Sequence, residues 1–413
     1  MNVAITGIGL TSGLGDGADG HAEKISAGQH ALRPLSGLFG KESKYAHLNA
    51  SWIENRKLMV SRKWAPASML SLHVAKQAIS DAGLTDAEVA DAAVIVGSSR
   101  GNVAGWVSPW PTRRPFNLMA ASNSMHGELA SVVSIELGIH GPWQVISSGC
   151  AASLDAMGMA WMMLQQGVVK RAIVIGVELP LIPEVVQAYE RTGVLATGPV
   201  NDPYSPDAGG FFPGEAGAAI VMESASALYD RRQAMESSYP GGHLSSGNGV
   251  DALARSMVQM TGYWCNSDAA SPIGMPTDGA GLRDCLNMAL TDLKDQSKLA
   301  AICPHASGTL LHGKAELAAL RAALPDDQTI SLHPLKPFTG HTVGASGILD
   351  CAILGHYLRE SQLPPNLPGI TCPGEPFSLE ANDLSPEGST VLKIAVGMGG
   401  HNSIVSLRSP SRT

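Results

Sequence analysis

The sequence has few aromatic and few charged residues. Only 5% of its 413 residues are aromatic and 15% are charged, whereas 46 are glycine. So little charge argues against a set of solvated helices, and so much glycine indicates tight turns and close approaches between backbone segments. Hydrophobic residues make up 44% of the chain, enough to bury a large core in two domains or in one unusually large domain. This profile is typical of a layered α/β protein.

The chain also lacks a long basic run and a long apolar run. Its formal charge is −8 and its isoelectric point is near 5.9, so attraction to nucleic acid or to an anionic membrane is not expected, and an acidic partner would need a local basic patch. No apolar run reaches the roughly 20 residues that span a bilayer. The N-terminal MNVAITGIGLTSGLG lacks the basic region of a signal or transit peptide.

The cysteines are too widely spaced for a disulfide framework or a zinc site. None belongs to a CxxC pair among the six, which are Cys150, Cys265, Cys285, Cys303, Cys351 and Cys372. A metal site at His305, His312 and His341 is not expected, because these histidines lack an HxxxH spacing and clustered carboxylates. The reducing cytoplasm is the expected compartment.

Alternating strand and helix patterns occur twice along the chain. In the first half, strands are predicted at 3–10, 92–99, 144–149 and 171–179, and helices at 74–84 and 150–167. In the second half, strands are predicted at 300–308 and 329–336, helices at 282–293, 313–324 and 344–358, and a hairpin at 392–408. Buried parallel strands and an α/β fold are expected. We place the boundary between the halves, 1–235 and 236–413, beside the turn-rich YPGGHLSSGNG.

Cys150 is a candidate nucleophile. It lies between a predicted strand and the start of a helix, where the helix N-terminus favours the thiolate. Small residues surround it in SSGCAAS and leave room for a substrate. The alternative is a small buried cysteine of the core.

His305 and His341 also lie at predicted strand ends, in ICPHASGT and KPFTGHTVGASG, where α/β sheets gather ligands. Nothing distinguishes the surroundings of His21, His30, His47, His73 and His356, which we interpret as surface or core histidines.

A third candidate is the glycine-rich GMGGHN at 397–402. It precedes no helix and lacks a following lysine, so a phosphate-binding loop is not expected. Its backbone N–H groups could stabilise an oxyanion, and the alternative is a tight hairpin.

Five motifs in this order resemble the elongating β-ketoacyl-ACP synthases: VAITGIGLTSGLG, the cysteine at a helix start, PHASGTLLHGKAE, KPFTGHTVGASG and GMGGHN. The resemblance covers nearly the whole chain and is weakest at 100–125 and 225–280. It implies a thiolase-like fold in which two pseudo-symmetric α/β halves form a layered α-β-α-β-α core.

The resemblance also implies roles for individual residues. Cys150 would be the acylated nucleophile, with His305 and His341 as the two active-site histidines. Lys336 and Glu316 match the supporting lysine and acidic residue of the family, which would set the local charge and hold the histidines. Alternatively, these two form a buried ion pair that supports the loop.

The remaining matches concern a glycine-rich gate beside the active site, the pantetheine that carries the substrate, and the carrier protein. The GMGG stretch, Gly397, Met398, Gly399 and Gly400, resembles the family's gate, which implies an oxyanion hole at the amides of Cys150 and Met398. Candidates for binding pantetheine are Ser307 and Thr309. Candidates for docking acyl carrier protein are Arg62 and Lys63, which could equally be a solvated helix start.

Three positions depart from the family pattern. Met398 replaces the gate phenylalanine, His401 replaces a threonine, and Ser307 replaces the first threonine of its motif. Because methionine adapts to varied apolar surfaces, we expect altered acyl-chain selection, for example of a polyene or another specialised chain. Further pocket residues are expected in distant segments, such as Trp106, Trp110 and Met119.

The implied reaction is decarboxylative condensation. An acyl group on Cys150 would react with malonyl-ACP and become two carbons longer, as a 3-oxoacyl chain of fatty-acid, polyene or polyketide type. Substrates would arrive on the phosphopantetheine of acyl carrier protein, and no metal or nucleotide cofactor would be required. A homodimer is expected, and a heterodimer with a related subunit stays open. The alternatives are a non-catalytic partner subunit of a heterodimeric synthase and a Cys–His acyl-transfer or hydrolytic enzyme.

Overall fold

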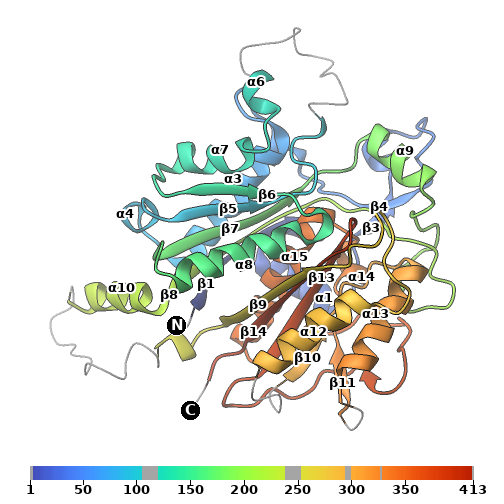
Figure 1. The fold of residues 1–413 in the computed structure, drawn as a ribbon. Coiled ribbons are helices and arrows are strands. Elements are labelled where there is room, and N and C mark those ends of the chain that lie inside the picture. Colours follow the sequence, from blue (N-terminus) through green and yellow to red (C-terminus); the bar gives the residue numbers. More distant parts are fainter. Residues whose placement is uncertain (1–2, 105–119, 238–252, 294–298, 326–327, 412–413) are drawn as a thin grey trace.

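A mixed sheet of twelve strands forms the frame of the protein (Figure 1). The computed structural model describes residues 3–104, 120–237, 253–293, 299–325 and 328–411. Across the sheet the strands follow the order β12-β11-β10-β13-β14-β9-β1-β8-β7-β5-β6, and β2 pairs with β1. Their bounds are β1 Val3–Ser12, β2 Gly15–Asp16, β5 Ala93–Gly97, β6 Trp143–Ile146, β7 Arg171–Glu178, β8 Ala216–Ser224, β9 Gln259–Ser267, β10 Leu299–Cys303, β11 Ile330–Leu332, β12 Phe377–Ser378, β13 Thr390–Gly397 and β14 His401–Arg408.

The two halves of this sheet share one topology. The N-terminal half has the order β6-β5-β7-β8-β1, and the C-terminal half has the matching order β11-β10-β13-β14-β9, with β12 added at the edge. In each half the first three strands of this order are parallel and the last three are antiparallel. The halves join where β1 pairs with β9. Two pseudo-symmetric halves are therefore confirmed, whereas β1, expected to be parallel, is antiparallel to both neighbours.

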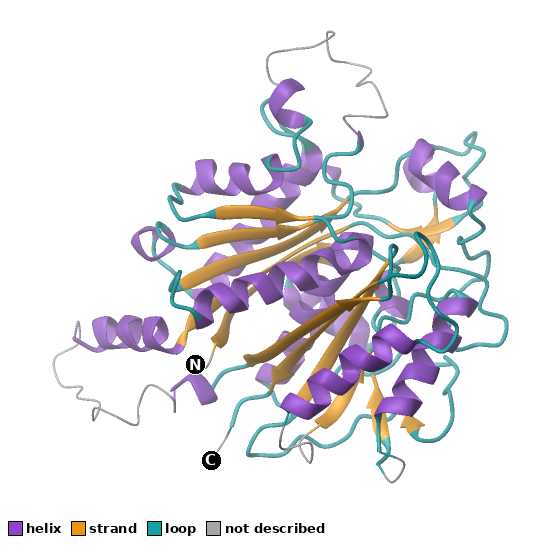
Figure 2. Ribbon diagram, viewed as in Figure 1, coloured by secondary structure: helices purple, strands orange, loops and turns teal. Residues whose placement is uncertain are grey.

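Helices lie between the halves and on both outer faces, so the predicted five layers are present (Figure 2). The central helices are α8 (Ala152–Gln165), which contacts β5, β7, β9 and β14, and α15 (Ser346–Arg359), which contacts β1, β8 and β13. The outer helices are α3 (Pro66–Ala82) and α7 (Glu128–Leu137) on the N-terminal half, and α12 (Ala280–Asp292) and α13 (Leu310–Ala323) on the C-terminal half. Apolar clusters fill the spaces between these layers.

Glycines allow the central helix α8 to approach the sheet closely. A Cβ atom on Gly97 would lie 2.2 Å from Cα of Ser153, and one on Gly176 would lie 2.8 Å from its Cβ. A Cβ on Gly347 of α15 would lie 2.6 Å from the backbone nitrogen of Leu154. Any larger residue would displace α8, which fixes the position of the chain just before it.

The remaining elements are short or peripheral. They are β3 (Leu32–Pro34) and β4 (Asn49–Ser51), which form a separate two-stranded sheet, together with α1 (Ala18–Ser26), α2 (Ser36–Phe39), η1 (Arg56–Met59), α4 (Asp86–Val89), α6 (Ala120–Asn123), η2 (Gly149–Ala151), α9 (Pro183–Arg191), α10 (Ala225–Ser237), α14 (Lys336–Thr339) and η4 (Val343–Ala345). Within the described ranges, no helix combines the length and the apolar composition needed to cross a membrane.

Most predicted elements are present, with shifted ends. The helix predicted at 74–84 begins earlier, at Pro66, because proline fits the first turn, and it ends before Gly83 at φ 63°. The strand predicted at 329–336 ends at Leu332, and Lys336 instead begins the short helix α14. The predicted boundary at 235/236 lies in α10, between the last strand of one half and the first strand of the other, and stays a prediction.

Two buried histidines make the stability depend on pH. Burial lowers the pKa of His21 and that of His333 to about 4, and His21 contacts the hydroxyl of Ser12 and the carbonyl of Gly17, both at 2.8 Å. The unfolded chain takes up these protons below about pH 6.5 and the folded chain only near pH 4, so stability falls as the pH falls through this window. We expect each histidine to remove about 2 kcal/mol between pH 7 and pH 5. Urea unfolding of His21→Gln should show a correspondingly smaller difference between these pH values, and an unchanged difference would contradict this account.

Candidate active site

Cys150 lies in η2, between the end of β6 and the start of α8, as predicted. Gly149 before it has φ 64°, a left-handed conformation that turns the chain sharply from strand to helix. The cysteine is only 6% exposed. Burial raises its pKa to about 11, although Lys336 and Arg100 oppose the shift. Desolvation therefore affects this sulfur more than the two nearby cations do, which favours the thiol and calls for a base, whereas the effect of the helix N-terminus stays a prediction.

His341 provides this base. Its Nε2 lies 3.2 Å from Sγ of Cys150, and its Nδ1 lies 3.2 Å from Oγ of Ser346, at the start of α15. Phe211 packs edge-on against the ring, with centroids 5.2 Å apart. Burial, followed by the positive charge of Lys336, holds the pKa of His341 well below its usual range. The imidazole is therefore neutral and can accept the thiol proton.

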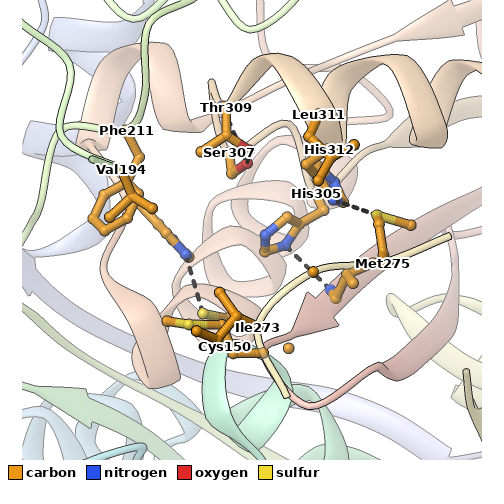
Figure 3. A pocket seen from close by; sticks show the side chains of 15 residues that line it. Cys150, Val194, Phe211, Ile273, Met275, His305, Ser307, Thr309, Leu311 and His312 are labelled. Atoms are coloured by element: carbon orange, nitrogen blue, oxygen red, sulfur yellow. Dashed lines mark hydrogen bonds between the residues drawn. The ribbon is translucent and has the colours of Figure 1, made fainter. Parts of the chain in front are cut away.

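His305 faces the same space from the end of β10 (Figure 3). Its Nδ1 accepts a hydrogen bond of 3.2 Å from the backbone N–H of Val396, and its ring centroid lies 5.2 Å from that of His341. Burial and Lys336 hold its pKa well below the usual range. A neutral ring that accepts at Nδ1 must carry its proton on Nε2, so His305 presents an N–H donor.

Glu316 of α13 supports the backbone around His305. Its carboxylate accepts the backbone N–H of His305 at 2.6 Å and that of Ala306 at 3.0 Å. Nε2 of His312 lies 3.5 Å from the same carboxylate, and the His312 ring packs edge-on against His305 at 4.7 Å. Although burial opposes it, His312 and these N–H groups lower the pKa of Glu316. One helical turn separates His312 from Glu316, so the predicted acidic residue lies beside the histidines as a single carboxylate rather than as part of a cluster.

Lys336 supports the same segment from below. Its ammonium donates to the carbonyl of His305 at 2.5 Å and lies 3.7 Å from the carboxylate of Asp350. An ion pair between Lys336 and Glu316 was one interpretation of the sequence, and it is wrong: within the described chain the ionic partner is Asp350. Lys336 instead binds the carbonyl of His305, whereas Glu316 binds the backbone N–H of the same residue.

A cavity of about 220 Å³ connects these groups. Its lining is mostly apolar, and it includes the predicted Ser307, Thr309, Gly397 and Met398. The full lining is Cys150, Val194, Phe211, Ile273, Gly274, Met275, His305, Ser307, Thr309, Leu311, His312, His341, Val396, Gly397 and Met398 (Figure 3). The expected pocket residues Trp106, Trp110 and Met119 lie outside the described residues.

The predicted gate is the tight turn between β13 and β14, with Gly399 at φ 95° and Gly400 at φ 79°. A Cβ on Gly397 would lie 3.5 Å from the backbone nitrogen of Cys150, so this turn touches the nucleophile loop. The backbone of Met398 hydrogen-bonds to the sulfur and thereby lowers the pKa of Cys150, while its side chain is 45% exposed. The backbone N–H of Met398 thus lies beside the sulfur, and an oxyanion hole at the amides of Cys150 and Met398 stays a prediction.

His401, one of the departures from the family pattern, anchors this turn. Its Nε2 lies 2.8 Å from the carboxylate of Asp155 in the first turn of α8. That carboxylate also accepts the hydroxyls of Ser148 and Tyr263. The gate and the nucleophile loop therefore share one carboxylate.

The basic candidates lie outside the cavity. Arg62 and Lys63 are exposed in the segment before α3. Lys63 pairs with Glu136 at 2.9 Å and lies 4.4 Å from the ring centroid of Trp64. Arg62 is therefore the better placed of the two to meet a partner.

Several residues of the site were missed in the sequence. Glu178, fully buried at the end of β7, accepts backbone N–H groups of Ser99, Arg100 and Gly344, and burial raises its pKa to about 7. It ties the segment after His341 to the N-terminal half. Asp350 and Lys393 lie beneath His305. In the sequence, the only feature that marks these two residues is a charge within an otherwise apolar run.

Fold and site together define a condensing enzyme of the thiolase-like class, with a cysteine from one half facing two histidines from the other. The chain belongs to the β-ketoacyl synthase family: residues 1–227 match its N-terminal domain and residues 242–369 its C-terminal domain. It is 24% identical to the oxytetracycline polyketide putative β-ketoacyl synthase 1 of Streptomyces rimosus, over 99% of this chain and 97% of that protein. It is 25% identical to the tetracenomycin polyketide synthase ketoacyl synthase alpha subunit of Streptomyces glaucescens, over 100% and 98%.

Solved structures share the fold over the same extent. The ishigamide ketosynthase/chain length factor has a TM-score of 0.81 at 22% identity, covering 99% of both chains. A type II polyketide ketosynthase complex with its acyl carrier protein, bound to the hexaketide, has a TM-score of 0.80 at 20% identity, also covering 99% of both.

Proposed function

We propose that this protein is an active β-ketoacyl-[acyl-carrier-protein] synthase in which Cys150, His305 and His341 perform decarboxylative condensation. The observation that carries the proposal is the distance of 3.2 Å between Nε2 of His341 and Sγ of Cys150, in a cavity that also contains the neutral His305. A thiol, a neutral base and a second N–H donor are the groups that acyl transfer and enolate formation require.

In the first half-reaction the acyl group moves to Cys150. His341 takes the thiol proton at Nε2 as Sγ attacks the thioester carbonyl, and the amides of Cys150 and Met398 hold the resulting oxyanion. The C–S bond to phosphopantetheine then breaks, and its thiolate leaves with the proton from His341. The enzyme retains a thioester at Cys150 and the base is neutral again.

In the second half-reaction a malonyl thioester occupies the cavity. Its bond to the carboxylate breaks, carbon dioxide leaves, and the electron pair forms an enolate whose oxygen accepts Nε2–H bonds from His305 and His341. The enolate carbon attacks the acyl carbonyl on Cys150. The Cys150 C–S bond breaks, Sγ takes up a proton from solvent and becomes a thiol again, and a 3-oxoacyl chain two carbons longer leaves on the carrier protein. The substrates carry their own phosphopantetheine, so we propose that no metal or nucleotide cofactor takes part.

The proposed substrates and partners follow the relatives. Those named above belong to polyketide synthases, so we propose a polyketide-type chain on an acyl carrier protein, with selection altered by Met398. The edge strand β6 leaves Trp143 43% exposed, which suits a second subunit, either a copy or a related chain. The thiols are all free, which suits the cytoplasm.

The second candidate is a chain-length-factor-like partner subunit, because one structural neighbour is a ketosynthase/chain length factor. Such a subunit needs no nucleophile, whereas here Cys150, His305 and His341 are present and in contact. Incubation with acyl-ACP and malonyl-ACP separates the two. A synthase releases carbon dioxide and yields a 3-oxoacyl-ACP two carbons longer, alone or with a partner subunit. Absence of both products in every combination would favour the partner-subunit function.

Reversal of charge at Arg62 is expected to weaken use of the carrier protein only. Arg62→Glu should raise KM for acyl-ACP about 3- to 10-fold, because an exposed cation steers an acidic partner. The rate with a small acyl thioester without carrier protein should stay unchanged. Arg283→Glu on α12, on the outer face of the other half, serves as the matched control. An equal loss with both substrates would exclude a docking role for Arg62.

A further inference from the structure

A second buried ammonium group lies beneath His305, beside that of Lys336. Lys393 of β13 is fully buried, with an exposed fraction of 0%. Its Nζ contacts the carboxylate of Asp350, the carbonyl of Pro304 at 3.2 Å and Sγ of Cys303 at 3.6 Å. An ammonium has three N–H donors, and these three acceptors match them. Lys393 thus connects β13, α15 and the end of β10.

The two lysines bind consecutive backbone carbonyl groups just after β10. Lys393 holds the carbonyl of Pro304, and Lys336 holds the carbonyl of the next residue, His305. Both ammonium groups share one carboxylate, that of Asp350, which is itself 1% exposed. Because one carboxylate cannot satisfy two buried ammonium groups, the carbonyl oxygens become obligatory ligands, and they are thereby fixed in position.

We propose that Lys393 is a positioning residue for the condensation: its ammonium group fixes the Pro304–His305 backbone, and through it the imidazole that donates to the enolate. This inference rests on the proposed function. His305 is otherwise oriented by the N–H of Val396, which is three residues beyond Lys393 on the same strand. One strand therefore supports the histidine twice, at the ring through Val396 and at the backbone through Lys393.

The electrostatics of the group agree with this geometry. Burial opposes the charge of Lys393, yet the attraction of Asp350 outweighs it and raises the pKa of Lys393, so this lysine is charged. The pKa of Lys336 is lowered by burial and by Lys393. The two positive charges add to burial in holding the pKa of His305 low. Lys393 thus also favours the neutral ring that donates from Nε2.

The test compares the two half-reactions in Lys393→Met. Decarboxylation of malonyl-ACP should fall about 10- to 100-fold in kcat with KM unchanged, since the donor is misplaced but the substrate site remains. Transfer of an acyl group to Cys150 should stay within about 3-fold, because the hydrogen bonds of Lys393 go to Asp350, Pro304 and Cys303 rather than to Cys150 or His341. Lys314→Met, on the exposed face of α13, is the matched control and should behave as the wild type.

A rescue experiment separates the ammonium group from the packing of its side chain. In Lys393→Ala, methylammonium ions should restore the decarboxylation rate at least about 10-fold, because they can bind Asp350 and the Pro304 carbonyl, whereas sodium at equal ionic strength should not. Unchanged kcat in Lys393→Met, an equal loss of both half-reactions with a lowered Tm, or no rescue by methylammonium would each overturn the proposal. A wild type that neither becomes acylated nor decarboxylates malonyl-ACP would instead overturn the proposed function itself.

Discussion

Replacing Cys150 with alanine is expected to abolish acylation of the protein and formation of the extended chain. The Sγ atom is the acyl acceptor, and no other group within the described cavity lining is a nucleophile of comparable strength. Without the covalent intermediate we expect the condensation rate to fall at least about 10³-fold. Intact-mass spectrometry after exposure to a panel of acyl-ACPs should show the acyl mass on the wild type only.

The control for this experiment is another thiol. Cys372 is exposed and lies outside the cavity, so Cys372→Ala should gain the same acyl mass as the wild type and condense at the same rate. A second readout is the pH dependence of acylation. Since burial raises the pKa of Cys150 to about 11 and His341 must take the proton, the rate should not follow a thiolate titration near pH 8.5. Acyl mass on Cys150→Ala would show that the nucleophile is a different residue.

The three reactive residues could be found in the sequence because of where they lie along it. Cys150 and His305 each follow a strand that ends in small residues, and such strand ends converge at one edge of a parallel sheet. His341 was also predicted at a strand end, but this was wrong, because β11 ends at Leu332 and the short helix α14 directly precedes this histidine. The order of the motifs then distinguished His305 and His341 from the other histidines. The layered fold followed in the same way, since its apolar strands and helices are long enough to be recognised.

The supporting residues could not be found in this way, because their partners are set by packing. Asp350 and Lys393 lie 43 positions apart and meet only because α15 packs on β13. The burial of Cys150 could not be predicted for a related reason: a helix start is visible in the sequence, but the depth of burial that raises the pKa of the thiol is not. Likewise, the strand predicted at 329–336 stops at Leu332, and Lys336, at the start of α14, donates to the carbonyl of His305, a contact between segments far apart in the sequence.

Substitution of the two histidines is expected to separate the half-reactions. His305→Ala should lower decarboxylation of malonyl-ACP about 10²- to 10³-fold, the usual effect of removing one oxyanion donor, while acylation of Cys150 persists. His341→Ala should impair both, because its Nε2 lies 3.2 Å from Sγ and also faces the cavity. Release of carbon dioxide measures the first reaction, and the acyl mass on Cys150 measures the second.

The asymmetry follows from the contacts of each ring. Nδ1 of His305 is occupied by the N–H of Val396, so this ring has only Nε2–H to offer and acts as a donor. The Nδ1 of His341 faces a serine hydroxyl, which can donate or accept, so this ring can change from base to donor between the half-reactions. His356→Ala, a substitution outside the cavity, should leave both rates unchanged. Equal losses of acylation in the two active-site variants would mean that the rings act as one unit, and the division of roles drawn from these hydrogen bonds would then be wrong.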